Sequence, residues 1–129
     1  KLLTLVADVM RSGDDVPVVT ADTLLYDALF EITKKGIAMT AVVDNDGHAI
    51  GVFTDGDLRR LIEKQHNFSN LVIRDVMSKN PRTIGSDKLA AEAVSIMEKF
   101  RINQLLVTDN DGKLTGALHI HDLTEAKVI

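Results

Sequence analysis

The sequence has no cysteine and no tryptophan, and its 129 residues include only two prolines, Pro17 and Pro81. The absence of cysteine excludes a disulfide framework and a cysteine-ligated metal site. No apolar run approaches the ~20 residues of a membrane span, and no signal peptide is visible. These absences leave the compartment open but suit the cytosol, so we predict a cytoplasmic protein with no membrane partner.

Aromatic residues and net charge are also low. The chain has four Phe and one Tyr, so the expected core is aliphatic, and a hydrophobic content of 45% is enough for a chain of this length to fold alone. The net charge of −4 argues against a broad surface for nucleic acid. Because the chain starts at Lys1 and enters predicted structure almost at once, we expect a fragment of a longer protein.

The most informative feature that is present is an internal repeat. A turn, a glycine and an acidic residue recur 65 positions apart: Asp44-Asn45-Asp46-Gly47, Gly51 and Asp57 correspond to Asp109-Asn110-Asp111-Gly112, Gly116 and Asp122. Asp8-Val9-Met10 also matches Asp75-Val76-Met77, with an offset of 67. A fixed period indicates structural units that bury their apolar faces together. Two units predict one pseudo-symmetric domain with a ligand-binding cleft between its halves.

Each repeat is predicted to fold as strand, helix, strand, strand and helix. Apolar stripes of helical period, β-branched runs and Asp-Gly hairpin turns carry this prediction. Asp22 and Asp87 precede the first helix of each repeat and are expected to cap it. The first repeat with its lead-in occupies 1–65, and the second with its connector occupies 66–129. The expected strands are 18–19, 40–43, 49–53, 83–84, 105–108 and 114–119, and the expected helices are 24–35, 55–64, 89–100 and one from 120.

Two such βαββα units in tandem resemble a pair of CBS domains, the Bateman module. The resemblance is carried by Gly51-Val52-Phe53-Thr54-Asp55-Gly56-Asp57-Leu58 and by Gly116-Ala117-Leu118-His119-Ile120-His121-Asp122-Leu123, and it covers roughly Leu5 to Ala126. It implies an α+β fold in which the two repeats pack about a pseudo-two-fold axis. It also implies a regulatory module with contacts between CBS domains that favour a homo-oligomer.

Further segments resemble the C-terminal part of bacterial D-arabinose 5-phosphate isomerases. They are Asp8-Val9-Met10 with Gly13-Asp14, the run from Gly51 to Arg60, and Leu118-His119-Ile120-His121-Asp122-Leu123. In that family a sugar-isomerase domain precedes the CBS pair, and the pathway leads to Kdo, a lipopolysaccharide sugar activated as CMP-Kdo. No such catalytic domain is present in these 129 residues, so we expect a non-catalytic fragment.

Thr54 and Asp57 form the first candidate ligand site. A helix N-terminus suits a phosphate, a hydroxyl such as that of Thr54 adds a donor, and an ionised Asp57 can accept from both ribose hydroxyls. CBS modules that bind nucleotides resemble this arrangement. The same Thr-x-x-Asp spacing is also a capping box that satisfies the helix start. The two interpretations are compatible, because a side chain can leave a cap to meet a ligand.

In the second repeat His119 replaces the threonine and Asp122 is kept. Histidine can donate to a phosphate, but it is bulkier and can narrow the site, so we do not expect the two sites to be equivalent. His119 and His121 would share one face of a strand, as in a zinc site. Because structural zinc needs about four ligands and no others are evident, we predict no metal and no cofactor.

Three further residues are weaker candidates for the ligand site. Asn103 and Gln104 stand where the first repeat has Ala38 and Met39, and they would read a base or a sugar; the alternative is strand-edge polarity. Arg82 would neutralise a phosphate; the alternative is a solvated charge. The Arg59-Arg60 pair more simply lies on a solvated helix face.

Three function classes remain open at this point. The first is a regulatory module that senses a nucleotide or nucleotide-sugar, either CMP-Kdo or an adenosine nucleotide, and acts on the sugar-isomerase domain. The second is a ligand-free module that organises the isomerase oligomer. The third, catalysis within this chain, is not supported by any nucleophile–base spacing in the sequence.

Overall fold

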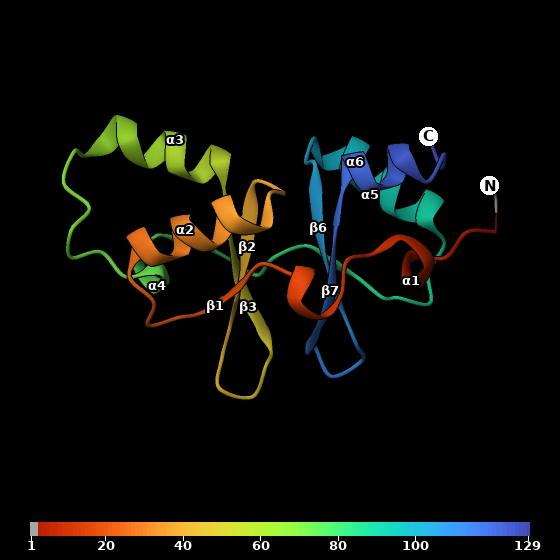
Figure 1. Cartoon of the computed structure of the whole chain (residues 1–129), viewed down its shortest axis with the longest axis horizontal. Coiled ribbons are helices and arrows are strands. Elements are labelled where there is room, and N and C mark those ends of the chain that lie inside the picture. Colours follow the sequence, from red (N-terminus) through yellow and green to blue (C-terminus); the bar gives the residue numbers. More distant parts are fainter. Residues whose placement is uncertain (1–2) are drawn as a thin grey trace. The chain divides into compact units, whose positions relative to one another are not determined.

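A computed structural model describes residues 3–129 and divides the chain into two compact units. The central unit is Val16–Pro81, and the split unit combines the residues up to Asp15 with Arg82–Ile129. These units differ from the halves 1–65 and 66–129, because each takes the lead-in segment that the sequence places with the other repeat. In Figure 1 the red N-terminal segment with α1 (Val6–Val9) therefore belongs to the same unit as the blue C-terminal elements.

The central unit is built on one four-stranded sheet. The strand order is β1-β2-β3-β4, with β1 parallel to β2 and the other neighbours antiparallel. Its elements are β1 (Val18–Thr20), α2 (Leu25–Lys35), β2 (Met39–Val43), β3 (Ala49–Thr54), α3 (Asp55–Lys64), α4 (Ile73–Val76) and β4 (Ser78–Lys79).

The split unit repeats this plan with a three-stranded sheet in the order β5-β6-β7. Arg11 forms an antiparallel bridge with Ala117 at the edge that β4 occupies in the central unit, where Ser78 pairs with Val52. Besides α1, its elements are the 3-10 turn η1 (Gly13–Asp15), β5 (Thr83–Ile84), α5 (Ala90–Phe100), β6 (Gln104–Thr108), β7 (Leu114–His119) and α6 (Ile120–Glu125).

Backbone hydrogen bonds explain why the lead-in segments change places. The N–H of Val6 donates to the carbonyl of Lys88 at 2.8 Å, and the N–H of Ala90 donates to the carbonyl of Thr4 at 2.7 Å. In the central unit Ile73 and Leu25 make the corresponding bonds to Thr23 and Leu71, at 2.7 and 2.8 Å. The segment that leads into each short helix thereby accepts a hydrogen bond from the first N–H of a long helix in the other sequence repeat.

The same segments complete the two cores. Val6 is fully buried with the apolar faces of α5, β6, β7 and α6, and Ile73 is fully buried with those of α2, β2 and β3. The buried members of the two clusters are Val6, Ile84, Ala90, Ala93, Val94, Met97, Leu105, Val107, Leu118 and Leu123, and Leu25, Ala28, Ile32, Val42, Phe53 and Ile73.

All strands and helices predicted from the repeat are found, with ends within one or two residues of those expected. The short helices α1 and α4 were not predicted, because four residues are too few to show a helical period. The prediction that Asp22 and Asp87 cap α2 and α5 is wrong: Leu24 and Leu89 are the N-caps, without a side-chain cap bond. Asp22 instead pairs with Arg74.

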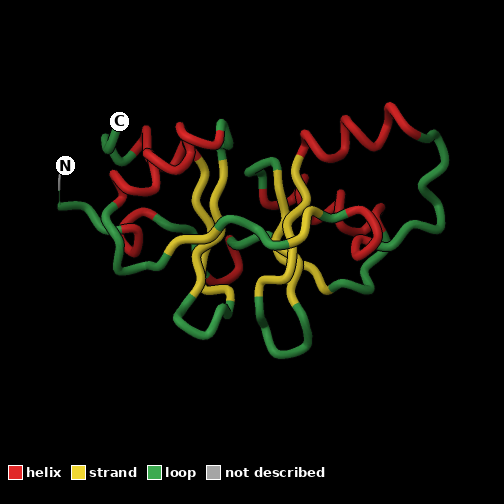
Figure 2. The backbone as a smooth tube through the Cα atoms, turned by 180° about the vertical axis from the view of Figure 1, so that it is seen from behind, coloured by secondary structure: helices red, strands yellow, loops and turns green. Residues whose placement is uncertain are grey.

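In each unit the second strand of a hairpin runs directly into a helix. Figure 2 shows this as yellow strands that continue into red helices, and these are the turns from β3 to α3 and from β7 to α6. Both turns carry predicted site residues. Within residues 3–129, none of the helices combines the length and apolar character required to cross a bilayer.

Candidate functional site

The turn from β3 to α3 holds Thr54 and Asp57 in a reciprocal capping box. The Asp57 N–H donates to Thr54 Oγ1 at 3.3 Å, and the Thr54 N–H donates to Asp57 Oδ2 at 3.0 Å. The box satisfies backbone donors that the start of a helix otherwise leaves unpaired. The capping interpretation of the sequence is therefore confirmed, and it leaves Oδ1, the other oxygen of Asp57, outside the box.

That other oxygen, Oδ1 of Asp57, accepts two hydrogen bonds from exposed groups. Arg60 Nη2 donates at 2.7 Å from one turn further along α3, and Ser78 Oγ donates at 3.2 Å from β4. The Asp57 side chain is 13% exposed and that of Arg60 is 66% exposed. Oδ1 is thus an acceptor whose present donors are exposed and exchangeable with solvent or a ligand.

The turn from β7 to α6 has the same backbone arrangement with a different side chain. The His119 N–H donates to Asp122 Oδ2 at 3.1 Å, and the His121 N–H donates to His119 Nδ1, also at 3.1 Å. Nδ1 of His119 must carry a lone pair in this geometry. The rings of His119 and His121 stack with centroids 4.7 Å apart.

Asp122 differs from Asp57 in its partner. Arg11 reaches both carboxylate oxygens, Nε to Oδ2 and Nη2 to Oδ1, at 3.1 Å each. The backbone of Arg11 is held by two hydrogen bonds to Ala117, of 2.8 and 3.1 Å. The side chains of Arg11 and Asp122 are 32% and 15% exposed. This is a two-pronged, partly buried ion pair, the stronger kind of guanidinium–carboxylate contact.

The remaining predicted residues occupy two places in the split unit. Gln104 lies opposite His119 in the β6–β7 register, and the carbonyl of Asn103 accepts from the N–H of Ile120 at 2.9 Å. Both therefore border the β7–α6 turn. Arg82 instead lies over the ring of Phe100, with Cζ 3.2 Å from the centroid, which is a cation–π contact. A ligand role for these three residues stays a prediction.

Sequence reasoning missed Arg11 and Ser78 as neighbours of the two aspartates. Both directly follow the repeated Asp-Val-Met segment, so the offset of 67 that links Met10 with Met77 also links Arg11 with Ser78. That correspondence was visible in the sequence. The sequence did not show the exchange of segments that brings Arg11 to Asp122 and Ser78 to Asp57.

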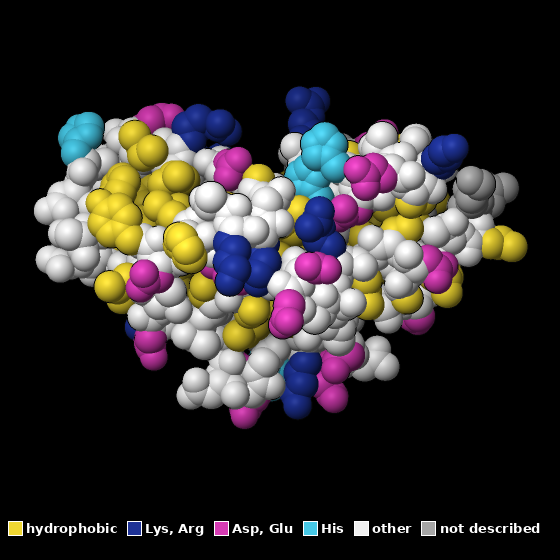
Figure 3. All heavy atoms as spheres, in the orientation of Figure 1, with side chains coloured by type: hydrophobic (Ala, Val, Ile, Leu, Met, Phe, Trp, Pro, Cys, Tyr) yellow, Lys and Arg dark blue, Asp and Glu magenta, His cyan; other side chains and the backbone are white. Residues whose placement is uncertain are grey.

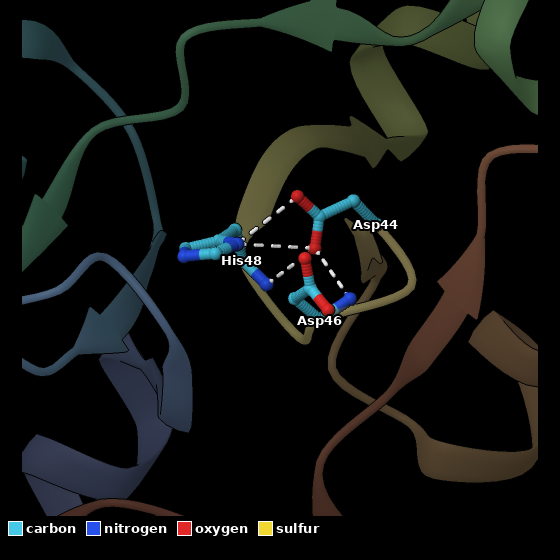
Figure 4. Close-up of side chains that lie close together, drawn as sticks. All are labelled: Asp44, Asp46 and His48. Atoms are coloured by element: carbon cyan, nitrogen blue, oxygen red, sulfur yellow. Dashed lines mark hydrogen bonds and ion pairs between the residues drawn. The ribbon is translucent and has the colours of Figure 1, made fainter.

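The β2–β3 turn gathers Asp44, Asp46 and His48, with one possible ligand atom from each within 4.8 Å of the others (Figure 4). The Asp44 carboxylate accepts from the N–H of Asp46 and of His48 at 2.9 Å each, and from the His48 ring. The backbone hydrogen bond from His48 is the main reason that the pKa of Asp44 lies below its usual range. Turn geometry accounts for this cluster, and the absence of a metal stays a prediction.

Comparison with known proteins gives related sequences. Arabinose 5-phosphate isomerase KdsD of Pseudomonas aeruginosa is 43% identical over all 129 residues of this chain and 40% of its own length. The protein of the same name from Yersinia pestis is 40% identical over 39% of its length. The chain thus spans about two fifths of these relatives.

Solved structures give the same architecture. CBSX2 in complex with AMP has a TM-score of 0.82 at 26% identity, covering 97% of this chain and 96% of that one. The CBS domain pair of MJ0100, in complex with 5′-methylthioadenosine and S-adenosyl-L-methionine, has a TM-score of 0.85 at 21% identity. The match covers 98% of this chain and 97% of that one, and at this identity it supports the fold alone. The CBS domain family model matches residues 6–64 and 73–129. The chain belongs to the CBS domain family and has the fold of a CBS pair.

Proposed function

We propose that this chain is a regulatory module that binds a phosphate-bearing nucleoside at the β3–α3 turn. The observation that carries the proposal is the environment of Asp57 Oδ1. This oxygen is held in place by the capping box, yet its two donors come from the exposed side chains of Arg60 and Ser78. A ligand with two adjacent hydroxyls can replace these donors without leaving a buried group unpaired.

The rest of the turn suits a phosphate. Thr54 Oγ1 accepts from the Asp57 N–H, so its hydroxyl hydrogen is left to donate. The Arg60 guanidinium covers the first turn of α3: a Cβ added to Gly56 would lie 3.2 Å from Nη1 of Arg60. Backbone N–H groups at the start of a ten-residue helix and a nearby guanidinium are both favourable for an anion. We therefore assign the ribose to Asp57 and the phosphate to Thr54 and Arg60.

The relatives narrow the candidates for the ligand and for the regulated enzyme. The solved structure of CBSX2 contains AMP, which makes an adenosine nucleotide the general candidate. The 43% identical relative is an arabinose 5-phosphate isomerase, so we propose that the module regulates a sugar-isomerase domain of that kind. CMP-Kdo is the pathway-guided candidate, because an activated end product is a sensible feedback signal for an early isomerase.

Calorimetric titration with AMP and with CMP-Kdo tests the proposal. Asp57→Asn should weaken binding by roughly ten- to a hundredfold, because an acceptor in a charge-assisted hydrogen bond is worth about 1.5–3 kcal/mol. The matched control is Asp22→Asn, which removes another paired carboxylate of the central unit and should leave affinity unchanged. Failure of the unaltered chain to bind either nucleotide would refute the proposal.

One observation favours assembly as a second function. Tyr26 and Phe30 lie one turn apart on α2 with 55% and 71% of their surface exposed, whereas Ala91 and Ser95 occupy the equivalent positions of α5. Figure 3 shows hydrophobic side chains gathered over α2 and α3. If this face joins copies of the chain, Phe30→Glu should lower the mass measured by light scattering, and Ser95→Glu should not. A monomeric unaltered chain would exclude this function for the isolated module.

A further inference from the structure

We propose that Arg11 decides which of the two equivalent aspartates accepts a ribose. Its ion pair keeps Asp122 occupied, so the chain binds one nucleoside, at Asp57, instead of two. This inference rests on the proposed function of the Asp57 site and deepens it, because it assigns a specificity-determining role to a residue of the N-terminal segment.

The inference starts from a difference at one oxygen. Asp57 and Asp122 each use Oδ2 to accept the N–H of the preceding cap residue, at 3.0 and 3.1 Å. Their Oδ1 atoms accept from different side chains of the segments that pair with β3 and with β7. Ser78 offers a single hydroxyl at 3.2 Å, whereas Arg11 spans both oxygens of its carboxylate with a planar guanidinium. The position that a ribose would need is taken by that guanidinium.

The two arginines near the aspartates also differ in how easily they leave. Arg60 is 66% exposed and pairs with Asp57 within one helix, and because ion pairs of exposed side chains are weak in water, a ligand displaces it at little cost. Arg11 is 32% exposed and binds Asp122 through two hydrogen bonds, and its own backbone is hydrogen-bonded to that of Ala117. Displacing Arg11 would leave the partly buried carboxylate of Asp122 without its cationic partner, which is energetically costly.

The surroundings of Asp122 point the same way. His119, which replaces Thr54, is buried and already accepts from the N–H of His121. The helix that follows, α6, has six residues against ten in α3, so it offers an anion a weaker helix terminus. The β7–α6 turn therefore binds the N-terminal segment of the chain, through Asp122 and Arg11, in place of a ligand.

Titration with AMP tests the inference on the full chain. We expect one AMP per chain and, in Asp122→Asn, an affinity equal to that of the unaltered chain. Ser78→Arg transfers the guanidinium to the Asp57 site and should weaken AMP binding at least about tenfold, because a forked charged pair must then be broken. The control Lys79→Arg adds the same side chain at the next position, which faces the other side of the strand, and should bind AMP normally.

Melting without a ligand tests the ion pair independently of nucleotide binding. Arg11→Gln should lower the Tm by roughly 3–8 °C, and Arg60→Gln by less than about 2 °C. Equal shifts in Tm would overturn the inference, whether or not AMP binds. Unequal shifts together with no binding of AMP would count against the proposed function and not against the strength of the Arg11 ion pair. Two AMP per chain, or a loss in Asp122→Asn as large as that in Asp57→Asn, would also overturn the inference.

Discussion

Gly116 packs directly against Met10, and this contact joins the last hairpin of the chain to its N-terminal segment. A Cβ added to Gly116 would lie 2.7 Å from both the Arg11 carbonyl oxygen and Met10 Sδ. Gly51 stands in the same relationship to Met77 and Ser78. The repeated glycines are therefore required by the close approach of a neighbouring backbone segment, β4 at Gly51 and Met10-Arg11 at Gly116. Each of these segments is one that the two repeats exchange.

Gly116→Ala should destabilise the protein by about 1–3 kcal/mol, because the carbonyl of Arg11 is backbone and cannot move aside cheaply. Urea unfolding followed by circular dichroism measures the difference. Gly56→Ala is the matched control: there the new Cβ would meet only the flexible end of Arg60, so we expect stability to be unchanged or slightly raised by helix propensity. Equal losses in the two variants would show that the edge contact does not require glycine.

Ile73→Ala should cost about 2–5 kcal/mol, because the side chain is fully buried in the core of the central unit and its loss leaves a cavity. Ile62→Ala, on the exposed surface of α3, should change stability by less than about 0.5 kcal/mol. Thermal and urea unfolding of both variants check this. If they unfold alike, the connector carrying α4 is not an essential part of that core.

Thr54→Ala should lower stability by about 1 kcal/mol, because the first turn of α3 loses the side-chain acceptor for the N–H of Asp57. Thr54→Ser keeps the hydroxyl and should retain most of that stability and, under the proposed function, the affinity for AMP. Unfolding and titration of the same two variants separate the cap from the ligand contact. A serine variant as unstable as the alanine variant would contradict the hydroxyl's role in the cap.

Glu31→Gln should produce a pH-dependent loss of stability. Burial alone would raise the pKa of Glu31, but hydrogen bonds from Lys35 Nζ and the Val18 N–H and the charges of Lys35 and Lys34 outweigh it, so the pKa lies below its ordinary value of 4.5. A lowered pKa means that the ionised form favours folding. The stabilisation is therefore complete above about pH 4.5 and is lost as the pH falls through the folded-state pKa.

At pH 7 we expect Glu31→Gln to cost about 1.5–3 kcal/mol, the range for hydrogen bonds to a charged group. The difference between this variant and the unaltered chain should shrink steadily in acid. Urea titrations at several pH values measure it, with the exposed Glu63→Gln as the control. A loss that stays constant into acid would mean that the ionised carboxylate of Glu31 is not what binds Val18 and Lys35.

Much of each unit could be predicted from the sequence, because the features involved are local. The Asp-Gly hairpin turns, the apolar stripes of α2 and α5 and the capping box at Thr54 each depend on residues a few positions apart. The 65-residue offset then made each prediction for one repeat a check on the other. The caps predicted at Asp22 and Asp87 failed because a distant backbone carbonyl had already taken the place of a cap: the N–H of Leu25 donates to Leu71.

What the sequence by itself determined is the pair of repeats, their element order and the equivalence of Asp57 with Asp122. Only the tertiary structure decided that the lead-in segments change places, and hence that Ser78 meets Asp57 while Arg11 meets Asp122. The physical reason is that short helices and edge strands carry no period of their own. Their positions are set by hydrogen bonds and burial against residues far away in the chain, which no local pattern records.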